Sequence, residues 1–181
     1  MVDAILTAAR LLVVKHGLEN LTTNAVARLA GVSIGSLYQY FPSKRAIVAE
    51  LRNQHQRMGE QIFRAELVML IDKPVPVATR RFVEKLIEVH RKEPELHRAL
   101  EMEGRSGGYG EWERQAVQLI RLYYERHRAE LTVDDLDLAS FLVSATSEAV
   151  THAAVMERPD LLRDDKLVEG LTRMLLAYLT G

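Results

Sequence analysis

Cysteine is absent from this chain of 181 residues. Disulfide bonds and thiolate metal sites are therefore excluded, which is compatible with a reducing cytoplasm, where we expect the protein to lie. We also expect no cofactor. Long apolar runs are absent too: Leu11–Val14 is typical of the longest, far short of the roughly 20 residues that a bilayer span needs. Because no signal-peptide pattern is visible either, we expect a soluble protein with no membrane partner.

Motifs that carry catalysis are also missing. The sequence has no Gly-rich phosphate loop, no nucleophile elbow and no His-Glu-x-x-His run, and the glycines of Gly104–Gly110 predict a flexible loop instead. A metal site at His90, His97 and Glu101 is an alternative, because His97 and Glu101 are four residues apart and would share a helix face. A solvated helix face explains these residues as well. We therefore expect no enzyme and no metal site.

Apolar residues make up 48% of the chain, which is ample for one or two domains with a buried core. Charge is unevenly distributed. Residues 1–52 carry six bases and three acids, a net charge of +3, so the remainder carries −4 against an overall −1. This asymmetry suits an N-terminal part that meets phosphate groups.

Residues 22–44 contain the most informative pattern. Apolar side chains recur at helical spacing from Thr23 to Ala30, which predicts a short helix preceded by a threonine cap. Gly31 suits a tight helix exit, and Ser33 is placed to cap a second helix from Ile34 to Tyr40. Two short helices joined by such a turn form a helix-turn-helix, whose second helix can enter the major groove of DNA. From the spacing alone, a helical hairpin inside a bundle remains the alternative.

The flanking sequence completes an all-α prediction of about nine helices. A first helix over Val2–His16 packs on the helix-turn-helix, while Leu37 and Phe41 are expected in its core. A long helix then runs from Lys44 to about Ile71 and ends at a Pro-rich break. The later helices are expected at 77–92, 95–103, 111–131, 136–157 (with Thr132 or Asp134 as starter) and 162–179. No alternating strand pattern competes with them.

Two stretches resemble the N-terminal domain of the TetR family of bacterial transcriptional regulators. They are ILTAARLLVVKHG and TTNAVARLAGVSIGSLYQYFPSKRAI, which lie within residues 4–50. The resemblance implies a DNA-binding domain over 1–46 and an effector-binding and dimerisation domain over 47–181. It also implies a homodimer that binds a palindromic operator, a repressor more often than an activator, and release by a small-molecule effector.

The resemblance assigns DNA contacts residue by residue. Ile34, Gly35 and Ser36 match positions that face base edges, and Asn24 sits where some members reach a base. Thr23, Tyr38, Tyr40 and Lys44 match phosphate-contacting positions, and their hydroxyl and ammonium groups can donate to phosphate oxygens. For the two tyrosines the alternative is that their rings cap the small core. Because the base-facing end offers no Arg, Gln or Asn, readout is expected to use Ile34, Ser36, Gln39 and Asn24 together with DNA shape.

Aromatic and apolar side chains of the C-terminal part are candidates for a pocket that takes a small apolar or aromatic effector. The candidates are Phe63, Phe82, Leu86, His90, Trp112, Ile120, Tyr123 and Tyr124, with Met102 and His127 as further residues to search. The alternative is that these side chains only pack in the hydrophobic core between helices and line no pocket.

The resemblance implies that the last two helices form the homodimer interface, in which each pairs with its mate in a four-helix bundle. The interface candidates are Phe141, Leu142, Ala145, Ala149, Ala153, Leu171, Met174, Leu175 and Tyr178. Intramolecular packing alone is the alternative. A helical interaction module without DNA affinity is the remaining alternative function, and the intact Tyr38, Tyr40 and Lys44 set argues against it.

Overall fold

The computed structural model describes residues 1–102 and 111–181, and the side chains of 1–100 and 114–181. Within these residues the fold is entirely helical, as the sequence predicts. The predicted loop over Gly104–Gly110, and the side chains of Glu101, Met102 and Trp112, lie outside the described part. Two compact units are present, and each is described by itself.

The first unit contains Met1–Met58 and the described residues from Glu95 onward. Its helices are α1 (Val2–His16), α2 (Thr23–Ala30), α3 (Ile34–Tyr40), the first part of α4 (Lys44–Leu70) and α6 (Pro94–Met102). Their apolar faces share one core, in which Ile5, Leu37 and Ile47 are fully buried. Phe41 also lies in this core, in the extended conformation that the following proline favours.

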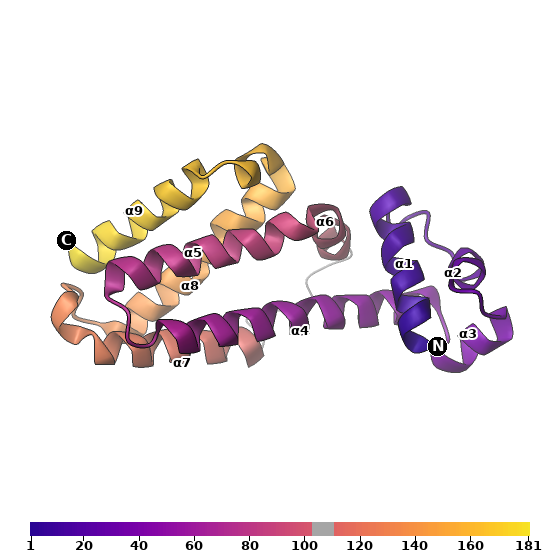
Figure 1. Ribbon diagram of the computed structural model, residues 1–181, viewed down its shortest axis with the longest axis horizontal. Coiled ribbons are helices and arrows are strands. Elements are labelled where there is room, and N and C mark those ends of the chain that lie inside the picture. Colours follow the sequence, from indigo (N-terminus) through magenta and orange to yellow (C-terminus); the bar gives the residue numbers. More distant parts are fainter. Residues whose placement is uncertain (103–110) are drawn as a thin grey trace. The chain divides into compact units, whose positions relative to one another are not determined.

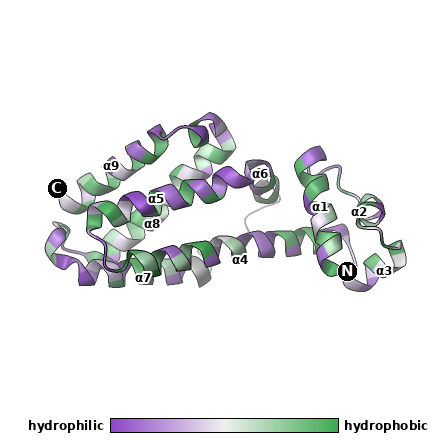
Figure 2. Ribbon diagram, viewed as in Figure 1, coloured by the Kyte–Doolittle hydropathy of each residue, from purple (hydrophilic) through white to green (hydrophobic). Residues whose placement is uncertain are grey.

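The second unit contains Gly59–Pro94 and the described residues up to Gly181. Its helices are the rest of α4, α5 (Val75–Lys92), α7 (Glu111–Arg126), α8 (Leu136–Glu157) and α9 (Lys166–Thr180), with 3-10 turns η1 (Arg128–Glu130) and η2 (Pro159–Arg163) (Figure 1). Along α5 and α9, hydrophobic residues recur between hydrophilic ones (Figure 2), and the hydrophobic sides of both helices meet in the core.

Several helix ends differ from the sequence prediction. Helix α5 begins at Val75, two residues early, because Pro76 occupies the first turn, where its missing N–H has no intrahelical partner. Helix α7 ends at Arg126 and the chain continues as a 3-10 turn. The cap of α8 is Asp135, whose Oδ1 accepts from the Leu138 N–H at 2.9 Å, and neither Thr132 nor Asp134 starts the helix.

Candidate nucleic-acid interface and apolar cavity

Two helix caps and one glycine turn fix the conformation of the helix-turn-helix. Thr22 Oγ1 accepts from the Ala25 N–H at 3.2 Å and so caps α2. Gly31 has φ 70° and ψ 29°, a left-handed conformation that glycine adopts without steric cost, and it turns the chain out of α2. Ser33 Oγ accepts from the Ser36 N–H at 3.0 Å and starts α3. The predicted bounds of both helices are therefore confirmed, with Thr22 rather than Thr23 as the cap.

One side of α3 belongs to the core and the other is open. Leu37 is completely buried, whereas Ile34 is 38% exposed and Tyr38 and Tyr40 are each 48% exposed. Asn24, Gly35 and Gln39 are exposed as well, and Ser36 is half-buried with its hydroxyl 2.8 Å from that of Ser33. Of the predicted base-facing residues, Ile34, Gly35 and Ser36 therefore lie at the accessible start of α3.

Three of the four predicted phosphate contacts, Thr23, Tyr38 and Lys44, are held by hydrogen bonds within the protein. The hydroxyls of Thr23 and Tyr38 lie 3.2 Å apart, which links α2 to α3. Lys44 Nζ donates to the backbone oxygen of Glu19 at 3.3 Å, which uses one of the three donors of the ammonium group. The bonded hydroxyls and the tethered ammonium are thus pre-positioned, and the lysine keeps donors for an anion.

The second unit contains a small, half-open cavity of about 30 Å³. Nine residues from α4, α5, α7 and α8 line it: Leu67, Leu70, Ala78, Thr79, Phe82, Ile120, Tyr123, Tyr124 and Val143. None of them carries a charge at neutral pH, and burial raises the pKa of both tyrosines further above it. A neutral, largely apolar molecule matches this lining, whereas an ion would lose its hydration without a partner.

Four of the eight predicted pocket residues line this cavity: Phe82, Ile120, Tyr123 and Tyr124. Phe63 does not line the cavity, but its ring centroid lies 5.7 Å from that of the lining residue Phe82. Leu86 is buried elsewhere in α5, and His90 places Nδ1 2.8 Å from the Leu86 backbone oxygen. Ala78 and Thr79 were not predicted, because small side chains give no aromatic signal. Leu67 and Leu70 were visible only as part of the apolar pattern of α4.

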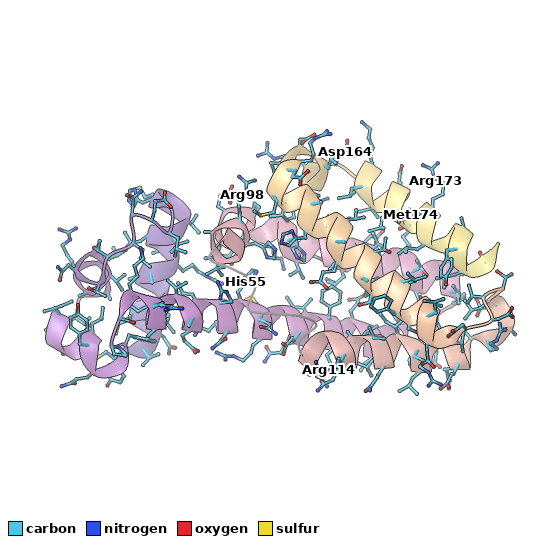
Figure 3. The ribbon with its side chains drawn as sticks, turned by 180° about the vertical axis from the view of Figure 1, so that it is seen from behind. His55, Arg98, Arg114, Asp164, Arg173 and Met174 are labelled. Atoms are coloured by element: carbon cyan, nitrogen blue, oxygen red, sulfur yellow. The ribbon has the colours of Figure 1, made fainter. Side chains whose placement is uncertain are left out.

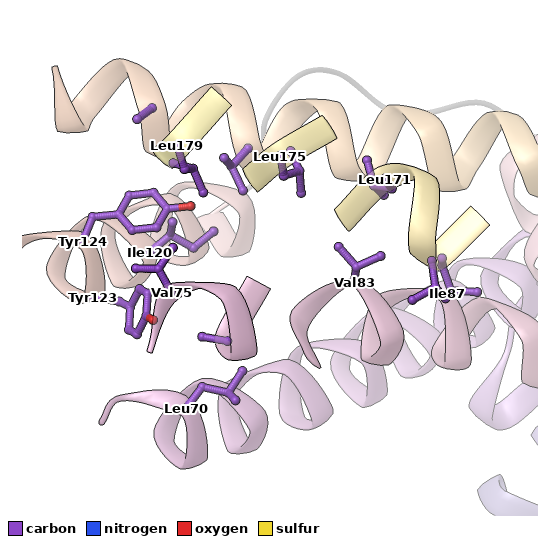
Figure 4. Close-up of a cluster of buried hydrophobic side chains, with 14 of the residues drawn as sticks. Leu70, Val75, Val83, Ile87, Ile120, Tyr123, Tyr124, Leu171, Leu175 and Leu179 are labelled. Atoms are coloured by element: carbon purple, nitrogen blue, oxygen red, sulfur yellow. The ribbon is translucent and has the colours of Figure 1, made fainter. Parts of the chain in front are cut away.

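The predicted interface residues of α8 and α9 divide into two groups. Phe141 is 46% exposed, Met174 is 47% exposed (Figure 3) and Tyr178 is 38% exposed. Ala149 and Ala153 are exposed, and Leu142 and Ala145 are half-buried. Leu171 and Leu175 instead point into the core of their own unit (Figure 4), at 3% and 4% exposure. Those two side chains pack inside their own subunit, so the predicted interface depends on the exposed candidates instead.

Two family profiles match the chain. One, described as bacterial regulatory proteins of the tetR family, matches residues 5–51. The other, described as the tetracyclin repressor-like C-terminal domain, matches residues 74–179, more than half of the chain. The chain belongs to the TetR family. It is therefore a transcriptional regulator with a ligand-binding C-terminal domain, and TetR regulators are not enzymes.

Solved structures with the same fold include other regulators. SmeT, the repressor of the Stenotrophomonas maltophilia multidrug efflux pump SmeDEF, is 20% identical with a TM-score of 0.69, over 100% of this chain and 91% of that one. A SmeT–triclosan complex aligns at 21% identity and a TM-score of 0.64, covering 99% and 91%. The fatty acid degradation regulator FadR from Bacillus halodurans aligns at 20% identity and 0.68, covering 96% and 97%. At these identities the likeness concerns the fold alone.

No curated protein matches the chain. In the part of the TetR regulator that the structure describes, no helix has both the length and the apolar character needed to cross a membrane.

Proposed function

We propose that this TetR regulator is a repressor that binds a palindromic operator as a homodimer in the cytoplasm and is released by a small neutral effector. As functional domains we assign DNA binding to residues 1–46, and effector binding and dimerisation to residues 47–181. The observation that carries the proposal is the open start of α3, where Ile34 and Gly35 are exposed beside the hydroxyls of Tyr38 and Thr23.

The DNA contacts divide by chemistry. Thr23, Tyr38, Tyr40 and Lys44 donate to phosphate oxygens and so fix the register of the protein on the duplex. Ile34 packs against a thymine methyl, while Ser36, Gln39 and Asn24 reach base edges. Two such helices about 34 Å apart, one in each subunit, would face successive major grooves of a palindrome.

The effector is a neutral apolar or aromatic molecule, because the cavity offers nine uncharged lining residues. The structure of SmeT with triclosan is an example of a small aromatic ligand on this fold. The cavity has a volume of only about 30 Å³, so a ligand such as triclosan has to displace lining residues. Among these are Leu67 and Leu70 at the end of α4, the helix that begins at Lys44 directly after the recognition helix. A ligand that prefers the widened form would thereby change α4 and shift the population away from the DNA-binding form.

The homodimer is supported by the apolar exposed residues of α8 and α9, namely Phe141, Met174 and Tyr178, together with the small Ala149 and Ala153. Small side chains allow two helices to approach closely. A symmetric interface must also be complementary to itself, which a continuous apolar face satisfies.

The test is selection of the purified protein against a random duplex library, followed by titration of the enriched duplex at several salt concentrations. We expect an inverted repeat and an affinity that falls steeply with salt, because phosphate contacts release counterions. The protein is also denatured and refolded before a second selection, which removes any copurified ligand. If neither sample enriches a motif, and binding stays weak at low salt, the chain is a helical interaction module and the proposal fails.

A further inference from the structure

The turn between α4 and α5 is held by side chains from the end of α7 and from η1. Tyr123 Oη donates to the Lys73 backbone oxygen at 2.7 Å, and Glu130 Oε2 accepts from the Val75 N–H at 2.8 Å. Arg126 forms an ion pair with Asp72. His127 completes the set through the backbone oxygen of Ile71, so the whole turn from 71 to 75 is bound to one short segment, 123–130.

Both ring nitrogens of His127 face oxygen atoms that can only accept. Nδ1 lies 2.7 Å from Glu130 Oε1, and Nε2 lies 3.0 Å from the Ile71 backbone oxygen. A neutral imidazole has a single N–H and would turn a lone pair toward one of these oxygens. Only the imidazolium form donates to both, so this geometry is that of a protonated histidine.

The two charges also match the ends of the helices that they touch. The imidazolium of His127 meets a carbonyl just beyond the C-terminus of α4, where the helix dipole favours a cation. The carboxylate of Glu130 meets the first N–H of α5, where the dipole favours an anion. The pair therefore acts as a joint cap for one helix end and the next helix start.

The charged groups around the ring act in opposite directions. Burial lowers the pKa of His127, whereas the hydrogen bonds to Ile71 and Glu130 raise it, and the net direction is upward. Arg126 lowers this pKa, but its charge is offset by its own partner Asp72. The bond from His127 and that from the Val75 N–H lower the pKa of Glu130, so both partners favour the charged pair.

This segment borders the cavity directly. Tyr123 is a lining residue, and its ring stacks on that of His127 with the centroids 4.5 Å apart. Leu70, one residue before Ile71, lines the cavity from α4, and Ala78 lines it from the first turn of α5. A ligand that widens the cavity by moving Leu70, Ala78 or Tyr123 therefore displaces neighbours of the residues that the His127–Glu130 pair holds.

We propose that His127 and Glu130 form a proton-dependent clamp on residues 71–75, which keeps the cavity narrow while His127 is protonated and loosens when His127 loses its proton. The effect on ligand binding rests on the proposed function; the clamp itself does not. Loss of the proton removes a charge and one of the two donated bonds at once, so the turn and Tyr123 gain freedom together.

The sign of the pH dependence follows from the two pKa shifts. A histidine whose pKa is raised on folding stabilises the fold fully below its ordinary value of 6.5, and this stabilisation is lost as pH rises through the folded value. Glu130, whose pKa is lowered, contributes above its ordinary 4.5 and loses its contribution below that value. The clamp is therefore closed in mildly acidic solution and opens on the alkaline side of 6.5.

The first experiment needs neither ligand nor DNA. The ring of His127 is titrated by NMR in the full chain, and amide hydrogen exchange of residues 71–75 is followed over the same pH range, corrected for the intrinsic exchange rate. We expect both ring nitrogens to carry protons up to a midpoint above 6.5, the ordinary value. Protection of the turn should fall about tenfold or more through that midpoint.

Three variants make the test specific. In His127→Gln, the amides of residues 71–75 should have the low exchange protection of the loosened turn at every pH. Glu130→Gln should lower the midpoint of His127, because it removes the anion while leaving an acceptor for Val75. His16→Gln, a change at an exposed histidine of α1, should leave the turn unchanged. The clamp would be overturned if the titration midpoint of His127 lay at or below the ordinary histidine value. It would also be overturned if the hydrogen-exchange protection of residues 71–75 did not change with pH.

The link to the cavity is measured with N-phenyl-1-naphthylamine, a neutral aromatic probe whose fluorescence rises in apolar sites. We expect its affinity to increase severalfold between about pH 6 and about pH 9 in the wild type and to be independent of pH in His127→Gln. If the pH at which probe affinity changes differs from the midpoint of the His127 titration, protonation of His127 does not control binding in the cavity. Absence of probe binding at every pH counts against the proposed effector class and leaves the exchange and NMR result to decide the clamp.

Discussion

Gly35 lies in a recognition helix where nothing in the chain requires a glycine. A Cβ placed there would have the Ser33 hydroxyl, at 3.8 Å, as its nearest heavy atom, and the glycine does not adopt a positive φ. Glycine inside a helix costs roughly 0.5–1 kcal/mol relative to alanine. An external reason for it is close approach of the α3 backbone to DNA.

We therefore predict opposite effects of Gly35→Ala on folding and on binding. The free energy of unfolding in urea should rise by about 0.5–1 kcal/mol, while the affinity for the selected operator should fall about tenfold, or about 1.4 kcal/mol. Gly59→Ala is the matched control, since Gly59 is also helical and also has open space around it. That variant should gain stability and keep its affinity. Full operator affinity in Gly35→Ala would exclude close DNA contact at this position.

Tyr38 and Lys44 allow hydrogen bonding to phosphate to be separated from charge. Lys44→Ala should weaken binding to all sequences and lower the slope of log affinity against log salt by about one per monomer. Tyr38→Phe should also weaken binding, but with the slope unchanged, because a hydroxyl releases no counterion. Fluorescence anisotropy at a series of salt concentrations measures both quantities. An unchanged slope in Lys44→Ala would remove Lys44 from the phosphate contacts.

At the scale of helices, local sequence signals placed the helix-turn-helix to the residue. Caps and turn residues act within a few positions, so Ser33 and Gly31 could be read directly. The ends of α5 and α7 were missed because Pro76 is tolerated in a first turn and because a 3-10 turn continues the apolar spacing of α7.

Faces of helices were harder to assign than their ends. Leu171 and Leu175 follow the same three-to-four spacing as Met174 and Tyr178, yet the first two are buried and the last two are exposed. Periodicity shows that the helix has apolar residues on two faces. It does not show which face is buried in the core of the same subunit and which stays exposed. The cavity was predicted only in part for a related reason, since Ala78 and Thr79 contribute space rather than a recognisable side chain.

Helix α5 offers a direct test of the cavity. Ala78→Leu adds three carbon atoms to a space of about 30 Å³, so it should abolish binding of N-phenyl-1-naphthylamine. Overpacking of this kind costs about 1–3 kcal/mol of stability. Val77→Leu, at a neighbouring exposed position, should alter neither property. Probe titration and urea unfolding measure the two effects, and undiminished probe binding in Ala78→Leu would place the ligand elsewhere.

At the scale of the whole molecule, we predict that Met174→Glu separates the homodimer. The side chain is half-exposed in one subunit, so the single chain should tolerate the charge, whereas a symmetric interface would bring two glutamates together. Sedimentation at several concentrations should show monomers with unchanged helical circular dichroism, and operator affinity should fall steeply.

The control for that variant is Leu122→Glu, which places the same charge at an exposed apolar residue of α7. It should remain dimeric. If Met174→Glu also sediments as a dimer, the exposed face of α9 does not form the contact between subunits.

The size of the cavity has a consequence for the timing of the response. A site with about 30 Å³ of space is too small for an aromatic molecule until the lining side chains move. Under the proposed function, the rate at which effector binds is then limited by the opening of the protein and levels off as effector concentration rises. The apparent affinity is likewise reduced by the fraction of molecules that are open at any moment. Such a regulator does not respond when the effector is present for less time than the protein takes to open. It responds only to exposures that last longer than this opening time.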